Sequence, residues 1–109
     1  MVDQEDKVMQ QLIQVLKEET QLKLSQILRH TNYRQYYGHY GIGNTVCALG
    51  AIARYFGWDG DYNPRSRSPS EIVESVIPEQ IVRDQIISMN DDSRKTFSEI
   101  ADWLEERGL

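Results

Sequence analysis

The sequence has little of what identifies many protein classes at sight. It contains one cysteine and two histidines among 109 residues, which excludes an internal disulfide and a zinc site built from cysteines alone. No apolar run reaches the roughly 20 residues that a membrane-spanning helix needs. Basic side chains are also scarce, 12 against 17 acidic ones, and the resulting net charge of -5 argues against a protein that coats DNA or RNA.

Size and composition predict one folded domain over residues 1–109. Hydrophobic side chains make up 39% of the chain and charged ones 27%, which is enough apolar material for a core. The first six residues are acidic and polar, unlike a secretory signal, so we expect a cytoplasmic protein without membrane contact. No motif indicates a cofactor or a metal ion, and neither is expected.

Residues 29–67 differ from the rest of the chain. They carry five arginines against two aspartates, whereas residues 1–28 and 68–109 are each net acidic. Both histidines and all six tyrosines also lie in this middle part. A basic, aromatic segment in an acidic chain is the one compositional asymmetry that indicates a function.

The segment 44–56 predicts a helix that is apolar nearly all the way round. Asn44 or Thr45 can cap its beginning, and Gly57 is suited to end it in the C′ position. A helix without a polar face must be enclosed by the rest of the protein. We therefore expect this helix at the centre of the fold.

Apolar spacing and capping residues predict further short helices. Ser68 with Glu71 and Thr96 with Glu99 form capping boxes, and Gly108 fits the end of the last helix. The expected ranges are about 3–18, 22–29, 69–77, 78–89 and 97–107. The segment 22–29 is either a second helix or a bent continuation of the first.

These elements predict an all-α fold, a compact bundle of five or six short helices around the buried helix at 44–56. The alternation of Leu22 and Leu24 could begin a strand, but no second strand-like run is present to pair with it. Three glycines between positions 38 and 43 discourage regular structure, so residues 30–43 are expected to form a loop. Residues 57–67 are expected to form a second loop, and residues 90–94 a polar turn.

Cys47 stands near the N-terminus of the expected central helix, where the helix dipole favours a thiolate. A cysteine-dependent enzyme that pairs Cys47 with His39 is therefore one hypothesis. The helix resembles the nucleophile helix of papain-like cysteine peptidases, yet that family needs a histidine base downstream of the cysteine, and here His30 and His39 lie upstream. A buried cysteine that fills a small core position is the preferred interpretation.

The tyrosine-rich part of the chain predicts a recognition surface. Tyrosine combines rigid apolar area with a hydroxyl group, and arginine stacks on aromatic rings. The alternative is that two or three of these rings only cover the central helix. The predicted binding residues are Tyr33, Arg34, Tyr36, Tyr37, His39, Tyr40, Arg65 and Arg67.

Two parts of the chain resemble a group of small uncharacterised bacterial and phage proteins. Residues Cys47–Ile52 match its Cys-Ala-x-Gly-Ala helix, and Ile87–Asp91 followed by Thr96–Ile100 match its Asn-Asp turn and Thr-apolar-x-Glu helix. Met89 stands where the group usually has an aromatic residue. The resemblance implies a compact α-helical protein in which the Asn-Asp turn packs near the central helix, and it implies no activity.

The sequence therefore best fits a small binding protein whose partner is another protein or a second copy of the chain. Catalysis through Cys47 and His39 is one alternative. Binding of single-stranded nucleic acid through the tyrosines and arginines is another, which the net charge disfavours.

Overall fold

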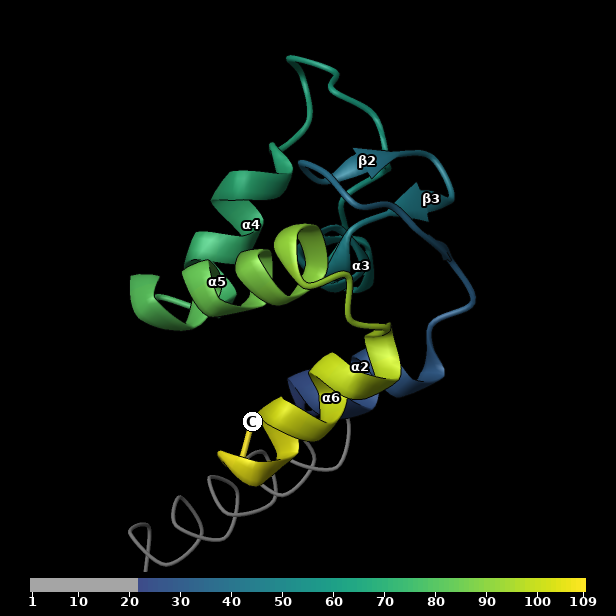
Figure 1. Ribbon diagram of the computed structural model, residues 1–109. Coiled ribbons are helices and arrows are strands. Elements are labelled where there is room, and N and C mark those ends of the chain that lie inside the picture. The colour runs from purple at the N-terminus through teal and green to yellow at the C-terminus, as the bar shows by residue number, and fades with distance from the viewer. Residues whose placement is uncertain (1–21) are drawn as a thin grey trace, which may run out of the picture.

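The computed structural model describes residues 22–109, so the helix expected over residues 3–18 lies outside the described part. One short helix is followed by three very short strands, and the rest of the chain forms helices (Figure 1). In chain order the elements are α2 (Leu24–His30), β1 (Arg34–Gln35), β2 (Gly41–Ile42), β3 (Thr45–Val46), α3 (Ala48–Tyr55), α4 (Pro69–Val76), α5 (Gln80–Ile87), the π-helical turn η1 (Ser88–Asp92) and α6 (Phe97–Glu106).

The prediction of an all-α fold is wrong, because the chain forms a small three-stranded sheet and the fold is α+β. The strands lie in the order β1-β3-β2. β1 runs parallel to β3, with Arg34 opposite Thr45, and β2 runs antiparallel to β3, with Gly41 opposite Val46. The segment 30–43, expected as a loop, supplies two of the three strands.

The glycines that seemed to exclude strands make this sheet possible. Gly41 has a φ of +86°, and a Cβ atom there would collide with the backbone of Thr45 in the neighbouring strand. Tyr40 just before it has a φ of +54°, and the amide of Gly41 donates to the carbonyl of His39 at 2.6 Å, which closes a three-residue turn. Strands of two residues show no alternation, so apolar spacing alone could not reveal them.

The central helix is shorter than expected. Residues 45–46 belong to β3, and α3 begins only at Ala48. Neither Asn44 nor Thr45 caps it: the cap is Cys47, whose Sγ accepts a hydrogen bond from the amide of Gly50 at 3.3 Å. The predicted end is confirmed, since Gly57 follows the helix with a φ of +109°.

Helix α3 contacts α2, α4 and α5 as well as β3, so it does lie in the middle of the described residues. Figure 1 shows α4 and α5 on one side of it and the paired helices α2 and α6 on the other. All six residues from Ala48 to Ala53 are buried. Gly50 allows the close approach of the sheet, because a Cβ atom there would collide with the carbonyl oxygen of Tyr40.

The capping signals read from the sequence are largely correct. Ser68 accepts a hydrogen bond from the amide of Glu71 at 3.2 Å at the start of α4. Thr96 and Glu99 form the complete capping box of α6, and these bonds lower the pKa of the Glu99 carboxyl. No helix of residues 22–109 is long and apolar enough to cross a membrane.

The expected polar turn at 90–94 is instead a widened helical turn that continues α5. The amide of Ser93 donates to the carbonyl of Ser88 at 3.0 Å, five residues earlier. This extra residue in the turn directs the side chain of Asn90 inward, where only 1% of the residue is exposed. Asn90 thus lies against the N-terminus of α3, the placement that the resemblance implied for the Asn-Asp turn.

The amide of Asn90 joins the sheet to the helices through four hydrogen bonds. Its Oδ1 accepts from the Gln35 side chain and from the backbone amide of Ala48, both at 3.0 Å. Its Nδ2 donates to the carbonyl of Tyr36 at 2.9 Å and to the carboxylate of Asp91 at 2.7 Å. Every donor and acceptor of this buried side chain is therefore used.

We expect Asn90→Asp to lower the free energy of unfolding by about 2 kcal/mol or more, because a carboxylate oxygen would face the Tyr36 carbonyl where a donor now lies. Urea denaturation measures the loss. Asn63→Asp is the matched control, since exposed Asn63 uses only its Oδ1, which accepts from the amide of Arg65. Its effect should stay within about 0.5 kcal/mol. Equal stabilities of the two variants would contradict the role given to Asn90.

Candidate functional site

One shallow hollow on the sheet brings together two of the predicted binding residues, Tyr36 and His39. It has a volume of about 340 Å³ and is lined by Tyr36, His39, Gly41, Ile42, Thr45 and Tyr62. We call Tyr36, His39, Ile42, Thr45 and Tyr62 the aromatic face. They come from the end of β1, the turn before β2, the strands β2 and β3, and the loop between α3 and α4.

Three large side chains of the aromatic face are unusually open to solvent. Tyr36 is 45% exposed, Ile42 62% and Tyr62 53%. Large apolar groups that gather on a hollowed surface are typical of an interaction site, whereas single exposed ones are ordinary. The hollow therefore offers apolar area and, through the tyrosines and Thr45, hydroxyl groups.

Tyr62 is fixed in place although it is exposed. Its hydroxyl donates to the carbonyl of Gly41 at 2.6 Å, and its ring packs edge-on against Trp58 at 5.7 Å between centroids. Trp58 is itself buried and donates from Nε1 to the carbonyl of Asp61 at 2.7 Å. Partial burial raises the pKa of the Tyr62 phenol, so the hydroxyl remains a donor at neutral pH.

Both edges of the sheet carry contacts from outside it. At β1, Asn90 bonds to the carbonyl of Tyr36, and the Gln35 side chain donates to the carbonyl of Lys95 at 2.7 Å. At β2, Tyr62 bonds to Gly41, and the amide of Gly43 donates to the carbonyl of Gly60 at 2.8 Å. The part of the sheet that is left open is thus its face and not an edge to which a further strand could be added.

The structure does not bring all the predicted binding residues together. Tyr36 and His39 line the hollow. Tyr40 is buried beneath the sheet, with its ring edge-on to Trp58 at 6.4 Å. The Tyr40 ring is thus part of the core, as the alternative interpretation of the tyrosines expected for some of them.

Four further predicted residues do not line the hollow. Arg34 is exposed in β1, and Tyr37 lies under the guanidinium of Arg94 at 5.5 Å. Arg65 and Arg67 are exposed in the loop that also carries Tyr62.

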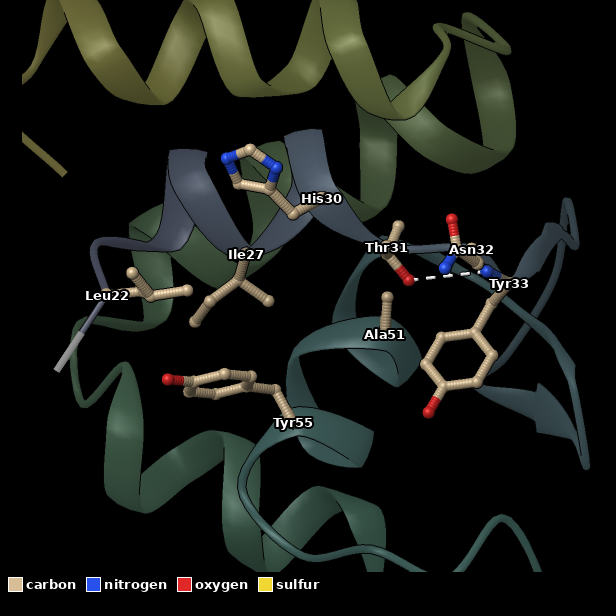
Figure 2. A pocket seen from close by; sticks show the side chains of 8 residues that line it. All are labelled: Leu22, Ile27, His30, Thr31, Asn32, Tyr33, Ala51 and Tyr55. Atoms are coloured by element: carbon tan, nitrogen blue, oxygen red, sulfur yellow. Dashed lines mark hydrogen bonds between the residues drawn. The ribbon is translucent and has the colours of Figure 1, made fainter. Parts of the chain in front are cut away.

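Tyr33 belongs to a second hollow, a groove of about 350 Å³ between α2 and α3. Figure 2 shows Leu22, Ile27 and Tyr55 pointing toward one another across it, with Ala51 and Tyr33 farther along. His30, Thr31 and Asn32 complete the lining. The guanidinium of Arg54 lies 5.2 Å from the centroid of the Tyr33 ring.

Cys47 and His39 line one small cavity together with Asn90 and Asp91, but its volume of about 10 Å³ holds no more than one water molecule. Cys47 is only 5% exposed. Burial raises the pKa of its thiol, and the hydrogen bonds from Gly50 and its neighbours oppose this only in part. The geometry favours a neutral thiol that caps α3 and does not favour a nucleophile.

Among residues 22–109, no three histidine, cysteine or carboxylate side chains are grouped so as to hold a metal ion.

Sequence reasoning missed Ile42 and Tyr62, and it placed Asn90 only in a turn near the central helix, without its contacts to the sheet. The sequence around these two residues carries a weak signal: Ile42 lies between two glycines, and Tyr62 lies between an aspartate and an asparagine. Their role depends on a turn and a loop that meet only in the folded chain. Arg65 and Arg67 were predicted as binding residues because of their charge. In the structure, Tyr62 of the same loop makes the contact with the sheet, through the carbonyl of Gly41.

We expect Cys47 to react slowly with iodoacetamide in the native protein at pH 7, at least about tenfold more slowly than in the urea-unfolded chain, because a buried, protonated thiol is a poor nucleophile. Mass spectrometry of the alkylated protein over time measures both rates. His39→Ala should leave the native rate unchanged. If Cys47 instead reacted faster in the native protein than in the unfolded chain, and His39→Ala removed this difference, the result would support the cysteine-dependent enzyme.

Comparisons with protein-family models, with curated proteins and with solved structures found no match. The resemblance to the group of bacterial and phage proteins therefore stays a prediction, and the function must be argued from the site itself.

Proposed function

We propose that this protein is a binding module that recognises another protein through the aromatic face. The observation that carries the proposal is the exposure of Tyr36, Ile42 and Tyr62 around one hollow. Tyrosine is enriched at the centres of protein interfaces, because it buries a large apolar area with few rotatable bonds. A second copy of the chain is one possible partner of this kind.

The shape of the hollow supports insertion of a partner's side chain. About 340 Å³ is near the lower end of the range for ligand sites, which suits one or two apolar side chains. Thr45 and the tyrosine hydroxyls can bond to the backbone beside them. The Tyr62 ring is already held by Gly41 and Trp58, so little side-chain freedom is lost on binding.

The composition of the hollow disfavours the other two functions. Its lining contains no carboxylate, lysine or cysteine. The hollow therefore lacks the Cys47 thiol that the cysteine-dependent enzyme would use as its nucleophile. Its lining also has no arginine or lysine, whereas nucleic-acid binding depends on contacts from basic groups to phosphates.

A photo-crosslinking amino acid at position 42 tests the proposal in cells that produce the protein. We expect it to form a crosslink to one discrete protein, while the same group at position 81 does not. Ile81 is a matched control, since it is 78% exposed on α5 and does not line the hollow. No crosslinked protein, equal products from both positions, or a crosslink to RNA would contradict the proposal.

With the captured partner purified, Ile42→Ser and Tyr62→Ala should each weaken its binding by about tenfold or more, because each removes apolar area from the centre of the interface. Ile81→Ser should leave the Kd unchanged. Isothermal titration calorimetry measures the three constants, and thermal unfolding of each variant shows whether the fold is intact.

A further inference from the structure

The groove between α2 and α3 is apolar over most of its length and has no occupant among residues 22–109. Leu22 and Ile27 form one wall, and Tyr55, 44% exposed, stands opposite them. Figure 2 shows these three side chains converging on the same space. Leaving these side chains in water is unfavourable, because burying one apolar side chain of this size stabilises the folded protein by about 1.5–3 kcal/mol.

The chain itself supplies a matching segment directly before the groove. Twenty-one residues precede Leu22, which is both the first described residue and part of the groove wall. The sequence predicts a helix over residues 3–18, on which Val8, Leu12 and Val15 fall on one face at the i, i+4, i+7 spacing. Gln14 falls on the opposite face, since it is about 200° round the helix from Leu12.

We propose that the apolar face of this N-terminal helix, made by Val8, Leu12, Val15 and Leu16, docks into the α2–α3 groove of the same chain. Residues 19–21 connect this helix to Leu22, and three residues are a length typical of the connection between two antiparallel helices, so the helix can turn back along the groove. The proposal is independent of the aromatic face, which shares no lining residue with the groove.

Charge complementarity supports this occupant. Residues 1–21 carry five acidic and two basic side chains. The groove lining contains no acidic residue, and the guanidinium of Arg54 lies 5.2 Å from the centroid of the Tyr33 ring at one end of the groove. An acidic helix therefore meets no like charge in the lining, and one cation lies close to the end that Tyr33 forms.

The covalent connection favours the chain's own helix over that of a second copy. A segment joined by three residues is present at an effective concentration in the millimolar range, far above that of a second protein molecule at ordinary concentrations. Docking within the chain also covers the apolar face of the helix, which would otherwise remain exposed to water.

Leu12→Glu and Gln14→Glu in the full-length chain test the proposal as a matched pair, because each introduces one negative charge. We expect Leu12→Glu to lower the Tm by about 4 °C or more and Gln14→Glu to leave it unchanged. When Leu12→Glu is combined with Tyr55→Ser, the two losses should not add, since both remove the same contact. Equal Tm values for the pair would overturn the docking.

NMR of the unmodified protein gives a second measurement that does not depend on a variant folding. Nuclear Overhauser contacts are expected between the methyl groups of Leu12 or Val15 and the ring of Tyr55. A sample that mixes labelled and unlabelled chains separates contacts within a chain from contacts between chains. Contacts only between chains would assign the groove to a second copy, and no contacts would leave the groove without this helix; either result overturns the proposal.

Discussion

The side chain of Asn90 is the contact on which the rest of the fold depends. It is almost fully buried and bonds at once to β1, to the first amide of α3 and to its own neighbour Asp91. No other buried polar side chain in the described residues joins so many separate elements. Because β1 is only two residues long, its pairing with β3 alone could not hold it, and the amide completes its attachment to the helices.

This attachment also determines the geometry of the aromatic face. The backbone of Tyr36 is held on one side by the carbonyl of Val46 at 2.8 Å and on the other by Asn90. Its side chain therefore leaves the sheet in a fixed direction, on the hollow that Ile42 and Thr45 of the other two strands also line. A surface arranged before its partner arrives loses less entropy on binding, so a small hollow can still bind with useful affinity.

The helices could largely be predicted from the sequence, because their signals are local. Ser68, Thr96 and Gly57 act at helix ends as their residue types predict. The strands could not be predicted, since two-residue strands have no periodicity and their pairing depends on Gly41 and on Asn90 almost 50 residues later. The site was predicted in part: Tyr36 and His39 line the hollow, whereas Tyr40 turned inward because its backbone adopts a positive φ.

The widened turn at Ser88–Asp92 limits how this chain can change in length. An ordinary α-helical turn would carry each residue about 100° round the axis, so removing one residue before position 90 would point its amide toward solvent. Substitutions on the exposed side of α5 leave that direction intact, but a single-residue deletion there disconnects the sheet from the helices. The turn and the asparagine therefore form one unit, which tolerates substitutions on the exposed side of α5 but not insertions or deletions.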